Sequence, residues 1–424
     1  MLEVFLLDNY RIKGGNVLSG TIKVSGAKNA ALPIIAASVM TRGESVLSSC
    51  PEISDVDSML KILKALGCRI DKTGETISIL PDEMDRCMIP DELMKEMRSS
   101  VFLAGALLTR CGEAVISSPG GCDIGKRPID IHIDGLEKLG ASVMHTNDRL
   151  ILRAGDMKGT DIHLPYPSVG ATENIMMAAL GAAGVTRIFN CAREPEIVDL
   201  QKYLNLCGAM IDGAGTGIIT IEGKTPLKGS CHDILPDRIE AGTYLLMALG
   251  TGGKIRLSNI NGMLLGPLID VLGSAGYIIE RGDSFIYAVS AGNEKVKCSI
   301  VTEPYPGFPT DLQPQLTAFL TRNGAGSVIK ENIFENRLDY AHQLKKMGAD
   351  IEISQKEVII KNNNILCGTY VEAKDLRGGA ALMIAGLMAE GETIVGNTKY
   401  IKRGYSRIGE KIRGLGGEIT ENEG

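Results

Sequence analysis

Apolar positions along the chain form a pattern that recurs six times. Each copy contains an aliphatic-x-x-apolar-Gly-x-x-aliphatic segment, in which a helical spacing of apolar residues stops at a glycine and a strand-like alternation begins. In LEKLGASV we expect a helix to end at Leu139, with Gly140 as a left-handed cap and a strand beginning at Ser142. Repetition at this period indicates stacked copies of one supersecondary unit. The six glycines are Gly67, Gly140, Gly208, Gly276, Gly348 and Gly416.

A second glycine marks the same copies independently and precedes a short strand pattern such as GEAVIS or GETIVG. It falls at Gly43, Gly112, Gly184, Gly253, Gly326 and Gly391. The stretch before each of these glycines is apolar nearly all round, which predicts a helix that is buried on every side. These stretches are 30–40, 99–108, 173–180, 240–249, 312–320 and 378–388. Buried helices with strands outside them indicate an inside-out α/β arrangement rather than an open parallel sheet.

Six such units in 424 residues are too many for a single core, and they fit two domains of three units each. We expect an N-terminal domain of residues 28–235, with a loop at 117–132, and a C-terminal domain of residues 1–27 plus 236–424. The segment LSGTIKVSG reads as a strand of the second domain. The hinge near HDILPDRIEAG is expected to be tight and double-stranded, with the active site in the cleft between the domains.

Composition narrows the class of protein. A hydrophobic content of 44% and a charged content of 23% are ordinary for a globular chain, and the net charge of −6 argues against a general nucleic-acid surface. MLEVFLLDNY lacks the basic start of a signal peptide, and no apolar run approaches the roughly 18 residues of a membrane span. We therefore expect a cytoplasmic protein with no membrane, nucleic-acid or obligate protein partner.

Cysteine and histidine usage argues against a metal or a redox cofactor. Ten cysteines occur without CxxC pairs, which fits free thiols in a reducing compartment, and the five histidines form no paired motif. GAGTG at 213–217 precedes a strand pattern rather than a helix, so it reads as a hairpin turn and not as a dinucleotide site. We expect no metal and no cofactor.

Polar groups gather at equivalent positions of the repeat. Counting 14 residues back from the second glycine leads to Asn29, Arg98, Gly170, Ile239, Leu312 and Arg377, each near the start of a buried helix. Helix N-termini bind anions, so Lys28, Arg98, Arg238 and Arg377 would line a site for a polyanion. The alternative is that these residues only cap helices and pair with the neighbouring acids Asp237, Asp311 and Asp375.

The loop SSPGGCDIGKRPIDIH, residues 117–132, carries the most reactive candidate. Adjacent glycines allow a ligand to approach the backbone closely, and Cys122 lies between them and the cations Lys126 and Arg127. Fixed cations lower a thiol pKa, so Cys122 is a candidate nucleophile or proton donor. The alternative is that it is one incidental thiol among ten.

Long motifs over the whole chain resemble the UDP-N-acetylglucosamine 1-carboxyvinyltransferases of the enolpyruvyl transferase family. They include SGAKNAALP (25–33), PGGCDIGKRPID (119–130), PSVGATENIMMAA (167–179), LPDRIEAGT (235–243), FPTDLQPQ (308–315), DLRGGAALMIAG (375–386) and RGYSRI (403–408). The resemblance implies a two-domain inverted α/β barrel. It also implies transfer of the enolpyruvyl group of phosphoenolpyruvate to the 3′-hydroxyl of UDP-N-acetylglucosamine with release of phosphate, which is the first committed step of peptidoglycan precursor synthesis. The related 5-enolpyruvylshikimate-3-phosphate synthases share the architecture, but SGAKNAALP and the Cys122 loop match the sugar-nucleotide enzymes.

The resemblance also implies roles for individual residues. Cys122 would donate the proton to C3 and could add covalently to phosphoenolpyruvate, and Asp311 would accept or orient the hydroxyl proton. Lys28, Arg127 and Arg403 would bind the phosphate and carboxylate groups. Arg337, Asp375 and Arg377 match positions that link substrate to cleft closure. The implied sugar-nucleotide contacts are Asn29, Arg98, Arg127, Pro128, Ile129, Asp130, Ile131, Ser168, Val169, Gly170 and Ile333.

One position departs from the family pattern, and one alternative function remains. Tyr166 stands where the family has a lysine, so a diphosphate contact there is in doubt, although an aromatic ring could pack beside uracil. The alternative is a catalytically drifted paralogue that binds the sugar nucleotide as a regulatory protein. Joint retention of Lys28, Cys122, Arg127, Asp311 and Arg403 argues against it, because a binding protein needs neither the loop thiol nor the acid.

Overall fold

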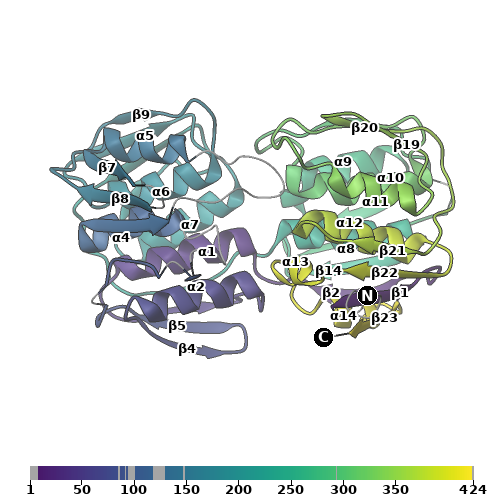
Figure 1. Ribbon diagram of the computed structural model, residues 1–424, viewed down its shortest axis with the longest axis horizontal. Coiled ribbons are helices and arrows are strands. Elements are labelled where there is room, and N and C mark those ends of the chain that lie inside the picture. The colour runs from purple at the N-terminus through teal and green to yellow at the C-terminus, as the bar shows by residue number, and fades with distance from the viewer. Residues whose placement is uncertain are drawn as a thin grey trace. The chain divides into compact units, whose positions relative to one another are not determined.

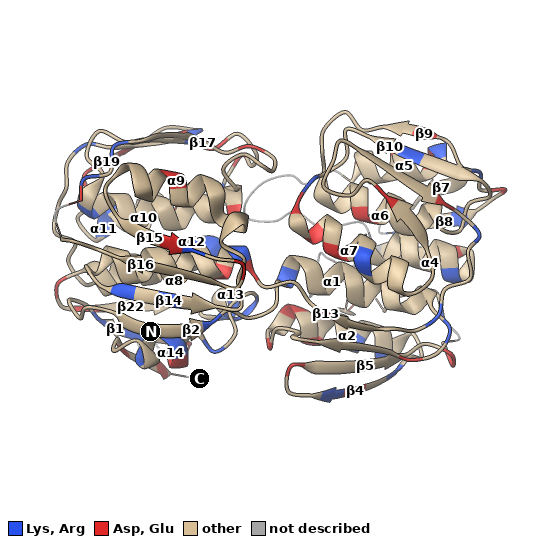
Figure 2. Ribbon diagram, turned by 180° about the vertical axis from the view of Figure 1, so that it is seen from behind, with Lys and Arg blue, Asp and Glu red and all other residues tan. Residues whose placement is uncertain are grey.

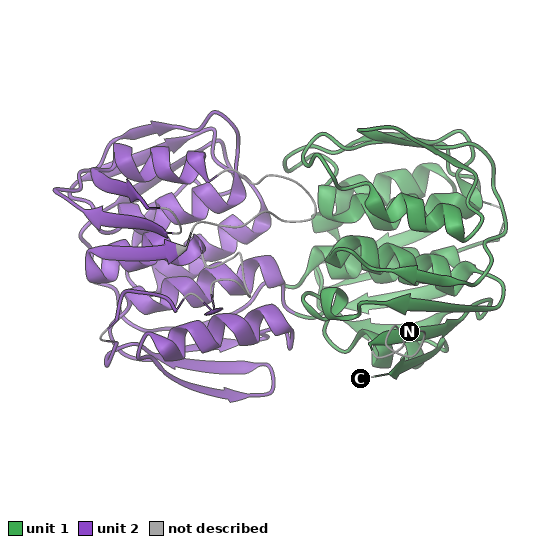
Figure 3. Cartoon of the chain, viewed as in Figure 1, with its two compact units in different colours: residues 1–25, 122–126, 236–424 green, residues 26–121, 127–235 purple. Residues whose placement is uncertain are grey.

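The computed structural model describes residues 8–84, 86–90, 92–93, 101–117, 129–146, 149–292 and 294–422 (Figure 1). Within these ranges the chain divides into two compact units, coloured separately in Figure 3. Unit 1 contains the described residues of 8–25 and 236–422, and unit 2 contains those of 26–117 and 129–235. Three small sheets belong to each unit, and each unit has its own buried hydrophobic cluster.

Six sheets in the described part of the chain follow one strand pattern. Five of them have four strands, with one outer pair parallel and the other two pairs antiparallel. The sixth sheet has three antiparallel strands, and an isolated parallel bridge between Met88 and Val115 takes the place of the outer pair. This recurrence confirms six repeated β/α units, three in each compact unit.

In unit 2 the sheets have the orders β13-β3-β5-β4, β6-β8-β7 and β11-β12-β10-β9. Their strands are β3 (Ser45–Ser48), β4 (Arg69–Thr73), β5 (Thr76–Leu80), β6 (Glu113–Ser117), β7 (Ala141–His145), β8 (Arg149–Ala154), β9 (Asp161–His163), β10 (Val185–Phe189), β11 (Met210–Asp212), β12 (Ile218–Glu222) and β13 (Cys231–Asp233). The helices of this unit are α1 (Lys28–Ala37), η2 (Ser38–Met40), α2 (Ser54–Ala65), α4 (Leu103–Cys111), α5 (Asp130–Lys138), α6 (Val169–Ala179) and α7 (Pro195–Leu206).

In unit 1 the sheets have the orders β21-β22-β1-β23, β15-β16-β14-β2 and β17-β18-β20-β19. Their strands are β1 (Asn9–Lys13), β2 (Ser19–Lys23), β14 (Lys254–Ser258), β15 (Ile278–Arg281), β16 (Phe285–Val289), β17 (Ser299–Val301), β18 (Val328–Lys330), β19 (Ile351–Ile353), β20 (Glu357–Ile360), β21 (Tyr370–Glu372), β22 (Glu392–Gly396) and β23 (Glu418–Asn422). The helices are α8 (Arg238–Gly250), η4 (Gly262–Leu265), α9 (Gly266–Ser274), η5 (Thr310–Leu312), α10 (Gln313–Asn323), α11 (Asp339–Lys346), α12 (Leu376–Met388), α13 (Lys399–Lys402) and α14 (Ile408–Gly414).

Three helices at the centre of each unit are the buried helices that the apolar stretches predict. They are α1, α4 and α6 in unit 2, and α8, α10 and α12 in unit 1, where they lie next to one another (Figure 1). Every residue of α8 is buried, as is every residue of α12 from Arg377 to Met388. Small residues allow such close packing: a Cβ added to Gly105 on α4 would lie 2.2 Å from the Asn174 carbonyl oxygen on α6. The inside-out prediction is confirmed.

The glycine that ends the second helix of each copy adopts the expected left-handed conformation. Gly67, Gly140, Gly208, Gly276, Gly348 and Gly416 have φ between 92° and 105°. The second marker is also left-handed in five copies, at Gly43, Gly112, Gly184, Gly326 and Gly391. In the fourth copy Gly253 directly precedes β14, as the pattern predicts, but it is not left-handed. There the left-handed residue is Gly252, with φ 78°, while a Cβ on Gly253 would lie 1.8 Å from the Leu18 carbonyl oxygen. Counting 14 residues back from Gly252 leads to Arg238 rather than to Ile239.

The described chain passes from one unit to the other at Ser25–Gly26 and at Leu235–Pro236. The strand before each passage pairs within the unit that the chain is leaving. β2 precedes α1 of unit 2 but pairs in parallel with β14 of unit 1, and β13 precedes α8 of unit 1 but pairs in parallel with β3 of unit 2. Within unit 1, Asp237 N donates to Ser25 O at 2.8 Å, and within unit 2, Ala27 N donates to Leu235 O at 2.6 Å. Each of the two segments that join the units therefore takes part in backbone hydrogen bonds with the other segment.

Charge is distributed around these cores. Figure 2 shows charged residues on the outer strands and at helix ends, while the central helices are largely uncharged. Among the described residues, no helix combines the length and apolar character that crossing a membrane requires.

Candidate active site

Asp311 lies in η5, immediately before the central helix α10, and its carboxylate is held by two guanidinium groups. Arg337 Nη2 donates to Oδ1 at 2.7 Å, and Arg377 Nη2 donates to Oδ2 at 3.0 Å. The side chain of Asp311 is 26% exposed, whereas those of Arg337 and Arg377 are 3% and 4% exposed. One carboxylate therefore balances two buried cations and still presents an edge to solvent.

The two arginines control the protonation of Asp311. Burial alone would raise the pKa of Asp311, but the charges of Arg377 and then Arg337 outweigh burial and hold the pKa well below its usual value. The carboxylate in turn raises the pKa of Arg377 despite the opposing effect of burial. Asp311 is consequently ionised at neutral pH. It is a strong hydrogen-bond acceptor and, in this arrangement, a weak base.

Arg337 is held on its other side by a buried acid network. Its Nη1 donates to Thr310 Oγ1 at 3.1 Å, and Thr310 Oγ1 donates to Glu331 Oε2 at 2.9 Å. The other carboxylate oxygen of Glu331 accepts from the backbone N–H of Ile333 at 2.8 Å. Glu331 is only 1% exposed, so it fixes the turn that carries Ile333 and, through Thr310, the guanidinium of Arg337.

Asp375 and Asp237 act as helix caps, a role that one of the two alternatives from the sequence gives to the cations, with these acids as their partners. Asp375 Oδ1 accepts from the backbone N–H groups of Arg377 at 2.9 Å and Gly378 at 3.0 Å. Asp237 Oδ1 does the same for Ile239 at 2.7 Å and Glu240 at 2.9 Å. Both carboxylates satisfy N–H groups that have no partner within their helices. The ion pair between Asp311 and Arg377 is one that this alternative predicts.

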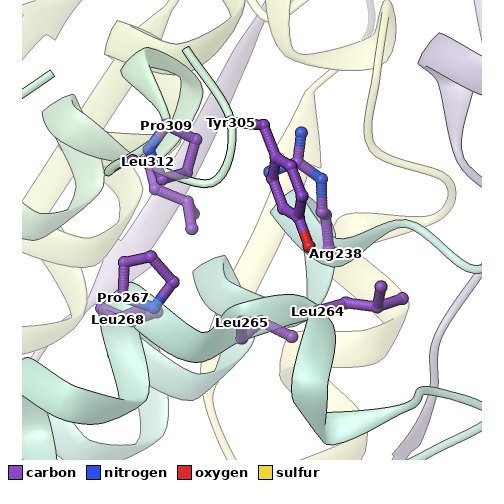
Figure 4. Close-up of a pocket in the computed structure, with 9 residues that line it drawn as sticks. Arg238, Leu264, Leu265, Pro267, Leu268, Tyr305, Pro309 and Leu312 are labelled. Atoms are coloured by element: carbon purple, nitrogen blue, oxygen red, sulfur yellow. The ribbon is translucent and has the colours of Figure 1, made fainter. Parts of the chain in front are cut away.

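Arg238 and Arg403 are the other two candidate cations in unit 1. Arg403 directly follows α13, at its C-cap. Arg238 opens α8, is 7% exposed, and has its guanidinium carbon 5.5 Å from the centre of the Tyr305 ring. Figure 4 shows these two side chains next to each other. A small pocket here is lined by Arg238, Leu264, Leu265, Pro267, Leu268, Tyr305, Gly307, Pro309 and Leu312. Most of this lining is apolar. Arg238 packs against Tyr305, which lies on the loop that precedes Asp311.

In unit 2, Lys28 is the first residue of α1 and Asn29 the second. A cation at a helix N-terminus is electrostatically unfavourable, and here the carboxylate of Asp55 compensates at 2.5 Å from Lys28 Nζ. The side chains of Lys28 and Asp55 are 12% and 5% exposed. Asp55 lies in the first turn of α2, and sequence reasoning did not identify it.

The segment Ser168–Val169–Gly170 starts α6. Ser168 is the N-cap, and its Oγ accepts from Ala171 N at 3.4 Å. Gly170 has no room for a side chain, because a Cβ would lie 2.9 Å from a ring carbon of Phe102 and 3.1 Å from one of His132. Tyr166 is 40% exposed, and its carbonyl accepts from Ser168 N at 2.7 Å. The backbone is therefore closely packed where the family resemblance implies contacts.

The segment Ile129–Asp130–Ile131 begins α5, with Asp130 at its first position. Asp130 Oδ1 accepts from the N–H of Ile131 at 2.9 Å, so this acid also serves a helix start. His132 follows, 9% exposed, with Nδ1 2.9 Å from Asn174 Nδ2. Burial lowers the pKa of His132 to about 4, although Asp130 opposes this, so the ring is neutral at physiological pH.

The structure brings Asp311, Arg337 and Arg377 together in unit 1 and places Lys28 beside Asn29 in unit 2. Cys122, Arg98, Arg127 and Pro128 lie outside the described residues. Sequence reasoning missed the supporting residues, chiefly Glu331, Asp55 and His132. The available signal was an acid or histidine within a few positions of a motif, which is weak without knowledge of packing. Among the described residues, no group of His, Cys, Asp and Glu side chains is placed to hold a metal ion.

Comparison with known proteins gives the family. The model of the family described as EPSP synthase (3-phosphoshikimate 1-carboxyvinyltransferase) matches residues 12–412. UDP-N-acetylglucosamine 1-carboxyvinyltransferase 2 of Caldanaerobacter subterraneus is 45% identical, covering 98% of this chain and 99% of that one. UDP-N-acetylglucosamine 1-carboxyvinyltransferase of Halothermothrix orenii is 46% identical, covering 98% and 100%. The chain belongs to the UDP-N-acetylglucosamine 1-carboxyvinyltransferase family.

Solved structures agree on the fold. The enolpyruvyl transferase NikO from Streptomyces tendae has a TM-score of 0.88 at 23% identity, covering 99% of both chains. EPSP synthase from Acinetobacter baumannii has a TM-score of 0.73 at 19% identity, covering 97% of this chain and 100% of that one. At these identities the likeness concerns the fold alone, which is the enolpyruvyl transferase fold of two inside-out α/β domains. The architecture inferred from the repeats is thereby confirmed.

Proposed function

We propose that this protein transfers the enolpyruvyl group of phosphoenolpyruvate to the 3′-hydroxyl of UDP-N-acetylglucosamine and releases phosphate. The carrying observation is the ionised Asp311 carboxylate, held by Arg337 and Arg377 at the start of a central helix in a chain of this family. Such a carboxylate accepts a hydrogen bond from an alcohol and fixes the direction of its lone pairs, as attack on an enol carbon requires.

The depressed pKa of Asp311 defines its part in the reaction. In the ground state it orients the 3′-hydroxyl as a hydrogen-bond acceptor. It takes the proton only as the C–O bond forms, because the alcohol becomes strongly acidic at that point. Substrate anions that draw Arg337 or Arg377 away would raise the pKa of Asp311 and strengthen it as a base.

The thiol of Cys122 gives its proton to C3 while the 3′-oxygen bonds to C2 and the hydroxyl proton passes to Asp311. Elimination then returns a C3 proton to the Cys122 sulfur and breaks the bond between C2 and the phosphate oxygen, and the proton held by Asp311 leaves with the phosphate, so both groups return to their starting states. Lys28, Arg127 and Arg403 would bind the phosphate and carboxylate of phosphoenolpyruvate and stabilise the charge that moves during addition.

Further residues would bind the sugar nucleotide. Ser168, Val169 and Gly170 would contribute through their backbone at the start of α6, and Ile333 through the turn that Glu331 fixes. Arg337, Asp375 and Arg377 would couple substrate to closure. The other proposed contacts are Asn29, Arg98, Arg127, Pro128, Ile129, Asp130 and Ile131.

The reaction would be the first committed step of peptidoglycan precursor synthesis, with consequences for cell shape and division. Both substrates are soluble cytoplasmic metabolites, and we therefore place the protein in the cytoplasm. The regulatory-paralogue alternative is disfavoured by the joint presence of Lys28, Cys122, Arg127, Asp311 and Arg403.

Phosphate release tests the proposal directly. The full-length protein is assayed with phosphoenolpyruvate and either UDP-N-acetylglucosamine or shikimate 3-phosphate as acceptor, with Cys122→Ala as the control for contaminating activity. Release with the sugar nucleotide and not with shikimate 3-phosphate is expected. Binding of UDP-N-acetylglucosamine without any release would favour the regulatory alternative, and release with shikimate 3-phosphate would reassign the acceptor.

A further inference from the structure

A tyrosine hydroxyl lies at the centre of the polar network behind the acid–arginine cluster. Tyr405 is 2% exposed and follows Arg403 by two residues. Its hydroxyl lies 3.3 Å from Arg377 Nη1, 3.1 Å from Gln315 Nε2 and 2.9 Å from Thr243 Oγ1.

The hydrogen-bond directions in this network follow from the chemistry of the groups. Arg377 and Gln315 can only donate through these nitrogen atoms, so both lone pairs of the Tyr405 oxygen are used. The hydroxyl proton is then free for Thr243 Oγ1, whose own proton goes to the Ile239 carbonyl oxygen at 2.8 Å. The Tyr405 hydroxyl is thus fully satisfied, with one bond given and two received.

The partners of Tyr405 come from the three central helices of unit 1. Thr243 is on α8, Gln315 on α10 and Arg377 on α12, and these helices lie side by side (Figure 1). The same guanidinium that donates to Tyr405 also donates to Asp311 through Nη2. The chain that carries Arg403 is therefore anchored on the group that orients Asp311.

We propose that Tyr405 is a positioning residue for the reaction, which acts by fixing the guanidinium of Arg377 and, through it, the carboxylate of Asp311. The role in catalysis rests on the enolpyruvyl transfer proposed above. Arg377 has one nitrogen on Asp311 and the other on Tyr405, so loss of the hydroxyl leaves the guanidinium free to rotate about its remaining bond. Asp311 would then stay ionised and keep its bond from Arg337, but one of the two contacts that orient its carboxylate would no longer be fixed.

The test removes the hydroxyl and keeps the ring. Tyr405→Phe is expected to lower kcat by about 10- to 100-fold, the equivalent of one hydrogen bond to a charged group, and to change KM for UDP-N-acetylglucosamine by less than about threefold. The matched control is Tyr203→Phe in unit 2, where a fully buried hydroxyl lies 2.9 Å from Ser45 Oγ, while the acid–arginine cluster belongs to unit 1. That control should lose comparable thermal stability and keep kcat. Equal kcat in Tyr405→Phe and wild type would overturn the proposal.

A double-mutant cycle identifies the partner. If Tyr405 acts through Arg377, Tyr405→Phe combined with Arg377→Lys should have a kcat within about twofold of Arg377→Lys alone. Independent, multiplicative losses would overturn the proposal. The same cycle measured by urea unfolding needs no turnover, so it still tests the Tyr405–Arg377 coupling if Arg377→Lys is inactive or if the wild type releases no phosphate. Absence of phosphate release by the wild type would refute the proposed function, whereas additive unfolding energies would refute this coupling.

Discussion

Replacing Asp311 with asparagine separates the two consequences of the acid–arginine cluster. The change keeps the size of the side chain and removes the charge that balances Arg337 and Arg377, whose side chains are 3% and 4% exposed. Breaking a buried ion pair by removing one partner costs about 3–5 kcal/mol. The asparagine oxygen can still accept from one arginine, and Asp311 is itself partly exposed. We therefore expect a loss of roughly 3 kcal/mol in the free energy of unfolding.

The loss of kcat in Asp311→Asn should be larger than its loss of folding stability alone would cause. An amide oxygen accepts a hydrogen bond from the 3′-hydroxyl but cannot take its proton, and a positioned acid or base contributes about 10²- to 10⁴-fold. Asp311→Asn should lose kcat by that amount, with KM for UDP-N-acetylglucosamine changed by less than about tenfold. A small loss in kcat together with a large rise in KM would show that Asp311 only anchors the sugar nucleotide.

The pH dependence of stability provides an independent check without substrate. The pKa of Asp311 is depressed in the folded state, so its contribution is fully present above the unfolded pKa of about 3.9 and is lost as pH falls through the lower folded value. The difference in Tm between wild type and Asp311→Asn should be constant above about pH 5 and shrink below about pH 4. Asp339→Asn is the control, because its ion pair with Lys374 at 3.2 Å is exposed at both ends. Identical Tm values for wild type and Asp311→Asn at pH 7 would refute the electrostatic reasoning.

Three further predictions concern unit 2 and the Cys122 loop. Cys122→Asp should keep appreciable phosphate release because a carboxylic acid can protonate C3, whereas Cys122→Ala should be nearly inactive; near-normal release by Cys122→Ala would remove the assigned role. Lys28→Met should lower the free energy of unfolding by about 3 kcal/mol by removing the cation that faces the buried Asp55 carboxylate, and Asp55→Asn in the same chain should restore stability in urea but not activity. Burial lowers the pKa of His132 to about 4, so the unfolded chain binds one proton more than the folded chain between about pH 6.5 and 4. The free energy of unfolding should therefore decrease as the pH is lowered through this window. His132→Gln should abolish that part of the decline in Tm, and an unchanged decline would contradict the assignment.

Local signals in the sequence predicted the repeated unit and most of its elements. The glycines Gly67, Gly140 and their equivalents predict helix ends because a left-handed cap is best made by a residue without a side chain. The all-round apolar stretches predict central helices because only a helix buried on every side can be apolar on every face. Both signals concern neighbours within a few residues, so the chain displays them directly. The same locality leaves the conformations of Gly252 and Gly253 open, since only packing against Leu18 distinguishes these two adjacent glycines.

The tertiary structure alone decided which strands share a sheet. The sequence predicts that LSGTIKVSG is a strand of the second domain but identifies no partner for it. In the structure β2 pairs with β14, which follows α8, and β13 pairs with β3, which follows α1. In the sheet β21-β22-β1-β23, strand β1 (Asn9–Lys13) lies between β22 (Glu392–Gly396) and β23 (Glu418–Asn422). Strand pairing depends on which backbone edges meet in space, and nothing in the side-chain pattern of a three- to five-residue strand identifies its partner.

The site divides in the same way. The repeat placed Lys28, Asp311 and Arg377 near helix starts, because equivalent positions of the six copies lie at the same distance from a marker glycine. The partners that determine their chemistry came from distant parts of the chain: Arg337 and Arg377 for Asp311, Asp55 for Lys28, and Tyr405 for Arg377. Protonation and orientation depend on charges and dipoles within a few ångströms, and only the fold brings together residues separated by tens of positions. The sequence therefore determined which reactive groups are available, and the packing of the central helices decided which of them act together.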